Sequence, residues 1–181
     1  MRRWAEVALA DLLMERRDAV LERWFDVLLR DYPRETARFL QTETDQFSNP
    51  VGHSTRRGLE GLLEWLLRDT DPDEARLLLD GIVRIRAVQD LSAGRAVAFI
   101  LLLKEVIRAE LATDIEAGRI SQEELHAFEM KVDNLALLAF DIYVECREQV
   151  HRIRMKELRR ASGVASRLGS TRWLSSDQLA R

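Results

Sequence analysis

The sequence of 181 residues has few helix breakers and a single cysteine: three prolines, eight glycines and Cys146. One cysteine excludes an internal disulfide and any zinc site built from several cysteines, and it fits a reducing cytoplasm. No stretch alternates apolar and polar residues as a β-strand does, and valine and isoleucine are scattered at helical spacing. We therefore predict an all-α protein in the cytoplasm.

No apolar run is long enough to span a membrane. The run from Ala96 to Leu103 has eight residues, whereas a bilayer requires about 20. Near the N-terminus, Glu6 and Asp11 interrupt the first apolar stretch and no small-residue cleavage site follows, so a signal peptide is not expected. These absences predict a protein without membrane insertion.

A strong overall charge is also missing, since 28 lysines and arginines face 31 acidic residues, a net charge of −3. This balance argues against general binding to nucleic acid or membrane surfaces. The charge is unevenly placed, because residues 147–172, the basic segment, carry a net charge of +6. We predict a docking surface for an acidic partner or for the acidic body of another copy, centred on Arg154, Lys156, Arg159 and Arg160. The alternative is that basic residues merely suit the C-terminal part of a helix.

Apolar residues recur at helical spacing along most of the chain. Residues 92–117 contain the eight-residue run, which predicts one central helix buried on every side. Residues 7–31 form one long helix or two helices joined near residues 15–18. Further helices are predicted over residues 33–40, 51–69 and 72–89, and a long last helix from the capping box at 121–124 to Ser162-Gly163.

The last helix carries apolar residues on two opposite sides. One set recurs at steps of three and four, as in a heptad pattern, and we expect it to pack antiparallel on residues 92–117. Its members are Leu125, Phe128, Val132, Leu135, Ala139, Ile142 and Cys146. The second set is Leu137, Phe140 and Val144. We predict a homodimer through this second face, although a contact within one chain is also open.

Polar residues interrupt the helix that precedes the central one. Arg84, Arg86, Gln89 and Asp90 either form a buried network or small pocket at the corner between the two helices, or lie on the wet face of their helix. Both readings stay open from the sequence. Gly58 and Gly61 lack a phosphate-binding loop pattern, and we expect them to allow close helix packing.

Two segments of the sequence resemble a known family. They are FSNPVGHSTRRGLEGLLEWLL, residues 47–67, and IVRIRAVQDLSAGRAVAFILLLKEVIRAEL, residues 82–111, and WFDVLLRDYP at 24–33 fits the same pattern. The most specific parts are FSNPVG and RIRAVQD. Over about residues 7–151 the chain resembles the N-terminal domain of the RsbR/RsbRD type of bacterial stressosome co-antagonist proteins.

The resemblance implies a globin-like helical bundle that carries no haem, usually forms a dimer and receives the signal for a regulator without being an enzyme. Full-length members continue into a STAS domain that is phosphorylated and captures a switch kinase. Only about 20 residues follow the predicted last helix here, so we do not carry kinase capture over. Stand-alone versions in anaerobic bacteria can lie beside genes of sulfite reduction, which implies an accessory role in sulfur metabolism as an alternative.

Histidine placement agrees with a fold that holds no cofactor. A haem-binding globin would need its proximal histidine in the helix before the central one, yet residues 72–91 contain none. His53, His126 and His151 share no metal-ligand spacing, and no histidine is near Cys146 in the sequence, which makes a nucleophilic thiol improbable. We therefore expect no metal, no cofactor and no catalysis.

The sequence thus predicts a non-enzymatic sensor or regulatory domain in residues 1–160, with a protein partner, followed by a flexible polar tail in residues 161–181. The alternative is a carrier or sensor of an apolar small molecule, such as a fatty acid, in the space that haem fills in globins.

Overall fold

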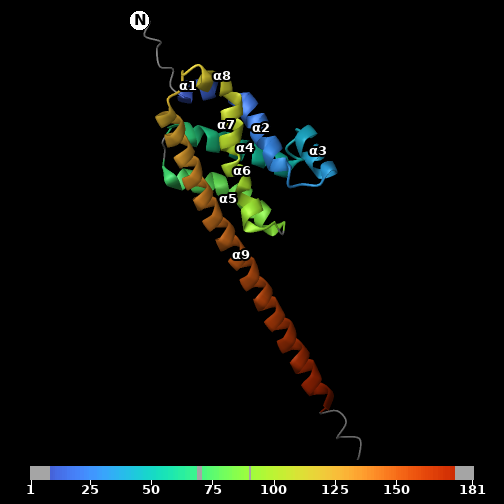
Figure 1. Ribbon diagram of the computed structural model, residues 1–181. Coiled ribbons are helices and arrows are strands. Elements are labelled where there is room, and N and C mark those ends of the chain that lie inside the picture. Colours follow the sequence, from blue (N-terminus) through green and yellow to red (C-terminus); the bar gives the residue numbers. More distant parts are fainter. Residues whose placement is uncertain (1–8, 69–70, 90, 174–181) are drawn as a thin grey trace, which may run out of the picture. The chain divides into compact units, whose positions relative to one another are not determined.

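The computed structural model describes residues 9–68, 71–89 and 91–173, and Figure 1 shows the order of its helices. The helices are α1 (Leu9–Glu15), α2 (Arg17–Leu29), α3 (Arg34–Thr42), α4 (Pro50–Arg68), α5 (Pro72–Val88), α6 (Ala93–Leu101), α7 (Leu103–Glu110), α8 (Ala112–Glu116) and α9 (Gln122–Trp173). These residues contain no strand, so the predicted all-α class with a long last helix is confirmed. None of the described helices combines the length and hydropathy needed to cross a membrane.

Contacts between residues divide the chain into two units, Met1–Val144 and Glu145–Arg181. The first unit contains α1 to α8 and the first part of α9, and the second consists of the later part of α9 and the residues that follow it. The boundary that we predict after residue 160, between the domain and its tail, is based on composition and not on contacts between residues, and it stays a prediction.

Helix α2 lies at the centre of the first unit and packs against α4, α6 and α7. Its inward side chains, Val20, Trp24, Phe25 and Leu28, are almost completely buried. The predicted joint near residues 15–18 is a break at Arg16, so the described residues 9–29 form two helices and not one.

Helices α4 and α5 approach each other closely because glycine faces the contact. A Cβ atom at Gly58 would come within 2.8 Å of the Ile82 side chain, and one at Gly61 within 2.6 Å of Leu78. The expectation that these two glycines allow close packing is confirmed. The tight contact holds α5, and with it Arg86, in a fixed position in the first unit.

The first turn of α9 is fixed by the predicted capping box. The Ser121 hydroxyl accepts a hydrogen bond from the Glu124 amide at 3.1 Å, and the Glu124 carboxylate accepts one from the Ser121 amide at 3.1 Å. Hydrogen bonds from the backbone and side chain of Ser121 lower the pKa of Glu124. The turn before α9 contains Gly118 with a φ of +67°, a conformation that favours glycine.

Within the first unit, α9 runs antiparallel to α7. Lys104 contacts Asp133 at 2.6 Å and Arg108 contacts Glu129 at 2.6 Å, so ascending positions on α7 meet descending positions on α9. All seven members of the predicted heptad stripe are buried: Leu125, Phe128, Val132, Leu135, Ala139, Ile142 and Cys146. The two ion pairs confirm the predicted antiparallel direction of α7 and α9.

The prediction of one continuous central helix is wrong. Residues 93–116 form three helices with turns at Leu102 and Leu111, and Leu101 within the apolar run is 43% exposed. Near each turn, a side chain from elsewhere in the chain donates a hydrogen bond to a backbone carbonyl. The Trp24 indole N–H donates to the Phe99 carbonyl at 2.8 Å, and the Arg16 guanidinium donates to the Glu110 carbonyl. In an unbroken helix each carbonyl would accept the amide four residues on.

The predicted end of the last helix at Ser162-Gly163 is also wrong, because α9 continues to Trp173. Serine and glycine disfavour a helix interior by only about 1 kcal/mol per residue, which does not force a break. Side chains beyond Arg160 lie outside the described part, so Trp173 and the other side chains of the tail cannot be placed.

Candidate functional site

The polar network at the corner of α2, α5 and α6 is built around Arg86, whose side chain is 1% exposed. Its guanidinium donates to the carbonyls of Ala96 at 3.0 Å and Arg95 at 2.9 Å, both in α6, and to that of Leu28 in α2 at 3.5 Å. It also forms an ion pair with Asp31, just after α2. One side chain therefore ties three helices together.

Asp31 is the shared anion of this corner. Its second carboxylate oxygen accepts a hydrogen bond from the Arg95 guanidinium at 3.0 Å, so one carboxylate lies between two arginines. A buried guanidinium without partners would be very costly, because its charge would lose hydration without compensation. The four acceptors on Arg86 satisfy this requirement and explain how arginine is tolerated in an otherwise apolar helix.

Aromatic rings close the corner around the same guanidinium. It lies 5.4 Å from the ring centre of Phe99 and 5.9 Å from that of Tyr32. Phe99 in turn stacks on Trp24 with ring centres 6.3 Å apart. The network is thus continuous with the bend between α6 and α7, where Trp24 holds the Phe99 carbonyl.

Two other residues predicted for this corner, Arg84 and Gln89, do not join the network. Arg84 is exposed and forms an ion pair with Asp80 on its own helix at 2.5 Å. Gln89 is exposed, and Asp90 lies outside the described residues. Of the three predicted residues that the structure describes, only Arg86 enters the buried network, and its partner Asp31 was not singled out from the sequence.

Helix α9 reaches the same corner through Tyr143, which is buried. Its hydroxyl donates a hydrogen bond of 2.6 Å to the Leu91 carbonyl in the connection between α5 and α6. This hydrogen bond therefore connects α9 to the segment that joins α5 and α6. The arrangement contains hydrogen-bond donors, a carboxylate and rings, a set suited to coupling helices.

The motif FSNPVG, residues 47–52, spans the end of the connection between α3 and α4 and the first residues of α4. The buried Asn49 side chain donates to the carbonyls of Leu40 at 3.1 Å and Glu43 at 2.8 Å, and it accepts from the Gly52 amide at 2.8 Å. A Cβ atom at Gly52 would come within 2.3 Å of the Asn49 amide. The spacing of asparagine and glycine is therefore explained by a helix cap.

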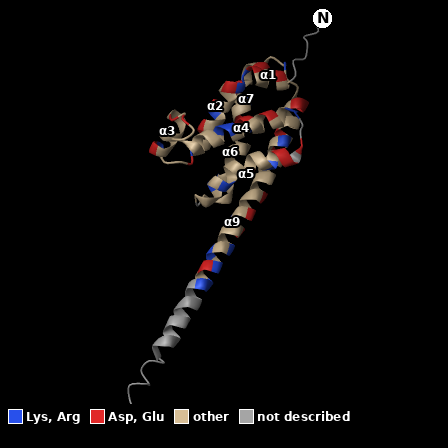
Figure 2. Cartoon of the chain, turned by 180° about the vertical axis from the view of Figure 1, so that it is seen from behind, with Lys and Arg blue, Asp and Glu red and all other residues tan. Residues whose placement is uncertain are grey.

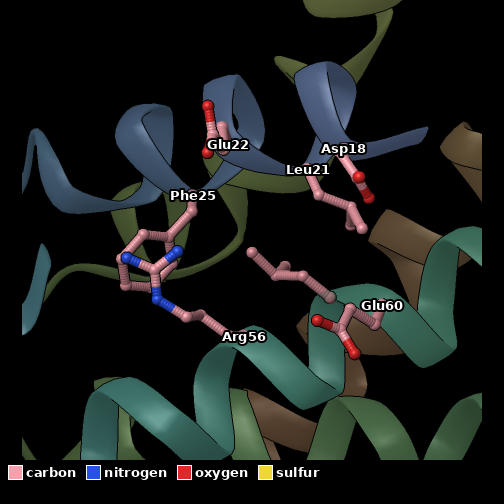
Figure 3. Close-up of a pocket in the computed structure, with 7 residues that line it drawn as sticks. Asp18, Leu21, Glu22, Phe25, Arg56 and Glu60 are labelled. Atoms are coloured by element: carbon pink, nitrogen blue, oxygen red, sulfur yellow. The ribbon is translucent and has the colours of Figure 1, made fainter. Parts of the chain in front are cut away.

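A small pocket of about 210 Å³ lies between α2 and α4 (Figure 3). Arg56 extends from α4 and covers the Phe25 ring, with its guanidinium 3.9 Å from the ring centre. Carboxylates of Asp18 and Glu22 from α2 and Glu60 from α4 lie around the opening. No sequence pattern indicated this pocket, because α2 and α4, which form its walls, are far apart in the chain.

A second buried ion cluster joins the start of α2 to α8. Asp114 is 1% exposed and contacts Arg16 at 2.5 Å and Arg119 at 2.6 Å. Burial alone would raise the pKa of Asp114, but hydrogen bonds from Arg119 and Arg16 and their positive charges lower it overall. The carboxylate is therefore held ionised, which suits a structural role.

The predicted dimer face is open to solvent. Leu137 is 67% exposed, Phe140 43% and Val144 37%. In the second unit, Arg154, Lys156, Arg159 and Arg160 are also exposed. Figure 2 shows Lys and Arg gathered along this later part of α9.

The described residues bring no metal-binding group together. No cluster of three or more His, Cys, Asp or Glu side chains among them has the geometry to hold a metal ion. His53 is half-buried, His126 and His151 are exposed, and Cys146 is buried.

In comparisons with known proteins, residues 18–158 match the family model described as the RsbT co-antagonist protein rsbRD N-terminal domain. The match covers more than three quarters of the chain and confirms the resemblance noted from FSNPVG and RIRAVQD. No curated protein and no solved structure matches the chain significantly.

Proposed function

The chain belongs to the RsbT co-antagonist protein rsbRD N-terminal domain family, and from this membership we propose a regulatory domain that acts by protein–protein contact and catalyses no reaction. The observation that carries the proposal is the family match over residues 18–158, which include both the Arg86 corner and the exposed face of α9. A cytoplasmic location is part of the proposal, supported by the single, unpaired cysteine.

The domain acts as a homodimer through the face formed by Leu137, Phe140 and Val144. Exposed apolar side chains that cluster on one helix face are typical of an interface. A two-fold axis would place this face against its own copy, so each apolar side chain would be covered by another.

Signals act at the Arg86 corner and are carried by α9. The corner couples α2, α5 and α6, and the hydrogen bond from Tyr143 to Leu91 links it to α9. A signal that changes the packing there alters α9 and, through it, the basic segment. Allosteric coupling requires a structural element that has two arrangements. The signal and the partner must each bind one of these arrangements more tightly than the other.

The output is capture of an acidic regulatory protein by Arg154, Lys156, Arg159 and Arg160. All four side chains are exposed, and complementary charge mainly speeds association and selects the partner. Reversal of these four charges to glutamate should abolish co-purification of the partner from cells of the source organism, whereas reversal of Arg34 and Arg38 on α3 should leave it unchanged. Equal capture by all variants would exclude this surface.

The dimer is tested by sedimentation of a Leu137→Glu/Phe140→Glu variant. We expect wild type to sediment as a dimer and the variant as a monomer, because two buried charges per copy would face each other. The control is Leu77→Glu/Val88→Glu, which places the same charges at exposed apolar positions of α5. A monomeric wild type, or dissociation by the control alone, would contradict the proposal.

The alternative of an apolar-ligand carrier has one observation in its favour. A pocket of about 240 Å³ between α1, α4 and α9 has a mostly apolar wall that includes Leu9, Leu66, Leu67 and Phe128. Pockets for small molecules usually measure about 300–1,000 Å³, so this one suits a fragment and not a fatty acid. Native mass spectrometry of purified protein decides this, since a bound lipid would appear as added mass.

A further inference from the structure

The exposed side of α9 repeats at an interval of seven residues. Met130, Leu137 and Val144 are spaced seven apart, and the same interval leads to His151 and Leu158. Met130 is 47% exposed and Leu158 64%. A strict seven-residue repeat of apolar side chains is the pattern of helices that pair along a seam. The register of the dimer face thus continues, in sequence, into the second unit.

Positive charge interrupts this seam between Val144 and Leu158. The intervening seam positions, at steps of three and four, hold Arg147, His151 and Arg154. His151 and Arg154 are exposed, and Arg147, Glu148, His151 and Arg152 line a shallow surface hollow. Three successive seam positions therefore carry cationic or titratable side chains, and the seam positions before and after them are apolar.

Pairing of two helices would concentrate this charge. Residues 147–160 contain six basic and two acidic residues, a net charge of +4, so two copies would bring +8 together. Glu148 lies beside Arg147 and Glu157 three residues beyond Arg154, and these carboxylates offset only part of it. Arginine at a seam position also loses hydration on pairing, which an anionic partner would restore.

We infer that Arg147, His151 and Arg154 of two copies form a shared site for a doubly charged oxoanion. The inference rests on the proposed homodimer and adds its regulation. Without the anion the helices pair as far as Val144 and separate beyond it. With the anion between them, guanidinium groups donate paired hydrogen bonds to its oxygens, and Leu158 meets its counterpart. Arginine and imidazole together recognise a phosphate or sulfate group, either free or as part of a small organic monoester.

Cysteine cross-linking measures both parts of the seam separately. In a Cys146→Ala background, Leu137→Cys reports pairing before the cationic layers and Leu158→Cys reports pairing after them. Each variant is oxidised in chloride, in inorganic phosphate and in glycerol phosphate at equal ionic strength. Should Cys146→Ala unfold, the natural Cys146 can remain, because a buried thiol reacts slowly.

We expect Leu137→Cys to cross-link in all three solutions and Leu158→Cys to cross-link roughly fivefold more with the oxoanions, an effect typical of allosteric coupling. A response to glycerol phosphate alone would assign the site to organic monoesters, and a response to inorganic phosphate alone would assign it to the free anion.

The seam charges are tested by Arg147→Gln/Arg154→Gln, which should cross-link at position 158 without an oxoanion and no longer respond to it. The matched control, Lys156→Gln/Arg159→Gln, removes the same charge from positions off the seam and should keep the response. Equal cross-linking at position 158 in all solutions, with intact cross-linking at 137, overturns the shared site alone. No cross-linking at 137 together with a monomeric wild type in sedimentation overturns the homodimer itself.

Discussion

The indole nitrogen of Trp24 donates a 2.8 Å hydrogen bond to the carbonyl of Phe99, and α6 ends two residues after that carbonyl. The Trp24 side chain is completely buried and its ring stacks on that of Phe99. A residue of α2 thus holds the bend between α6 and α7 in place. Helix α2 contacts both α6 and α7, on either side of this bend, and Leu101 at the end of α6 remains exposed.

Substitution of Trp24 by phenylalanine tests this contact. The variant keeps an aromatic ring but leaves the buried Phe99 carbonyl without its donor, so we expect a loss of about 1–3 kcal/mol in the free energy of unfolding. The matched control is Trp65→Phe, whose indole donates at 2.9 Å to the Asp71 carbonyl at an exposed position. Urea unfolding measures both, and equal losses would assign no special role to the bend.

Local signals in the sequence were sufficient for the starts of α5 and α6. Asp71 accepts a hydrogen bond from the Asp73 amide at 3.0 Å, and Ser92 accepts one from the Arg95 amide at 3.4 Å, as their positions before helical stretches predict. Each cap involves residues only two or three positions apart, so the sequence displays both partners together.

The bends and the partners of Arg86 could not be predicted in this way. Arg86 was recognisable as a polar residue in an apolar helix, but its ion-pair partner Asp31 is 55 positions away. The Phe99 carbonyl and Trp24 are 75 positions apart, and no glycine or proline marks the turn at Leu102. These features depend on tertiary packing, which helical periodicity does not encode.

Arg86 should be the most sensitive charged residue of the corner. Its replacement by methionine would leave Asp31 and three backbone carbonyls of α2 and α6 with fewer donors, so we expect a loss of about 3–5 kcal/mol in the free energy of unfolding. Arg84→Met removes an exposed ion pair from the same helix and should cost less than about 1 kcal/mol. Denaturant unfolding compares the two, and a similar loss in both would contradict the buried network.

Two glycines in helices should respond oppositely to alanine. At Gly52 the new methyl group would collide with the Asn49 amide and disturb the cap of α4, so we expect destabilisation by about 1–3 kcal/mol. At Gly81 a Cβ atom meets nothing within 4 Å, and alanine should stabilise α5 by about 0.5–1 kcal/mol. Thermal unfolding distinguishes these outcomes, and stabilisation by both substitutions would show that Asn49 has another rotamer available.

Asp114 should contribute stability that is lost in acid. Because its pKa is lower in the folded protein than in the unfolded chain, the unfolded state binds more protons as the pH falls. Its contribution is therefore complete above about pH 4, the ordinary range for aspartate, and decreases as the pH falls towards the folded pKa. An Asp114→Asn variant should be less stable than wild type at pH 7, and the difference should shrink below about pH 4.

Asp45 and Glu124, whose pKa values are also lowered, are unchanged in the variant and cancel from the difference. Asp18→Asn, at an exposed carboxylate, is the control and should differ little from wild type at any pH. Urea unfolding at intervals from pH 7 to pH 3 measures the three proteins, and a constant difference between Asp114→Asn and wild type would show that Arg16 and Arg119 do not hold this carboxylate ionised.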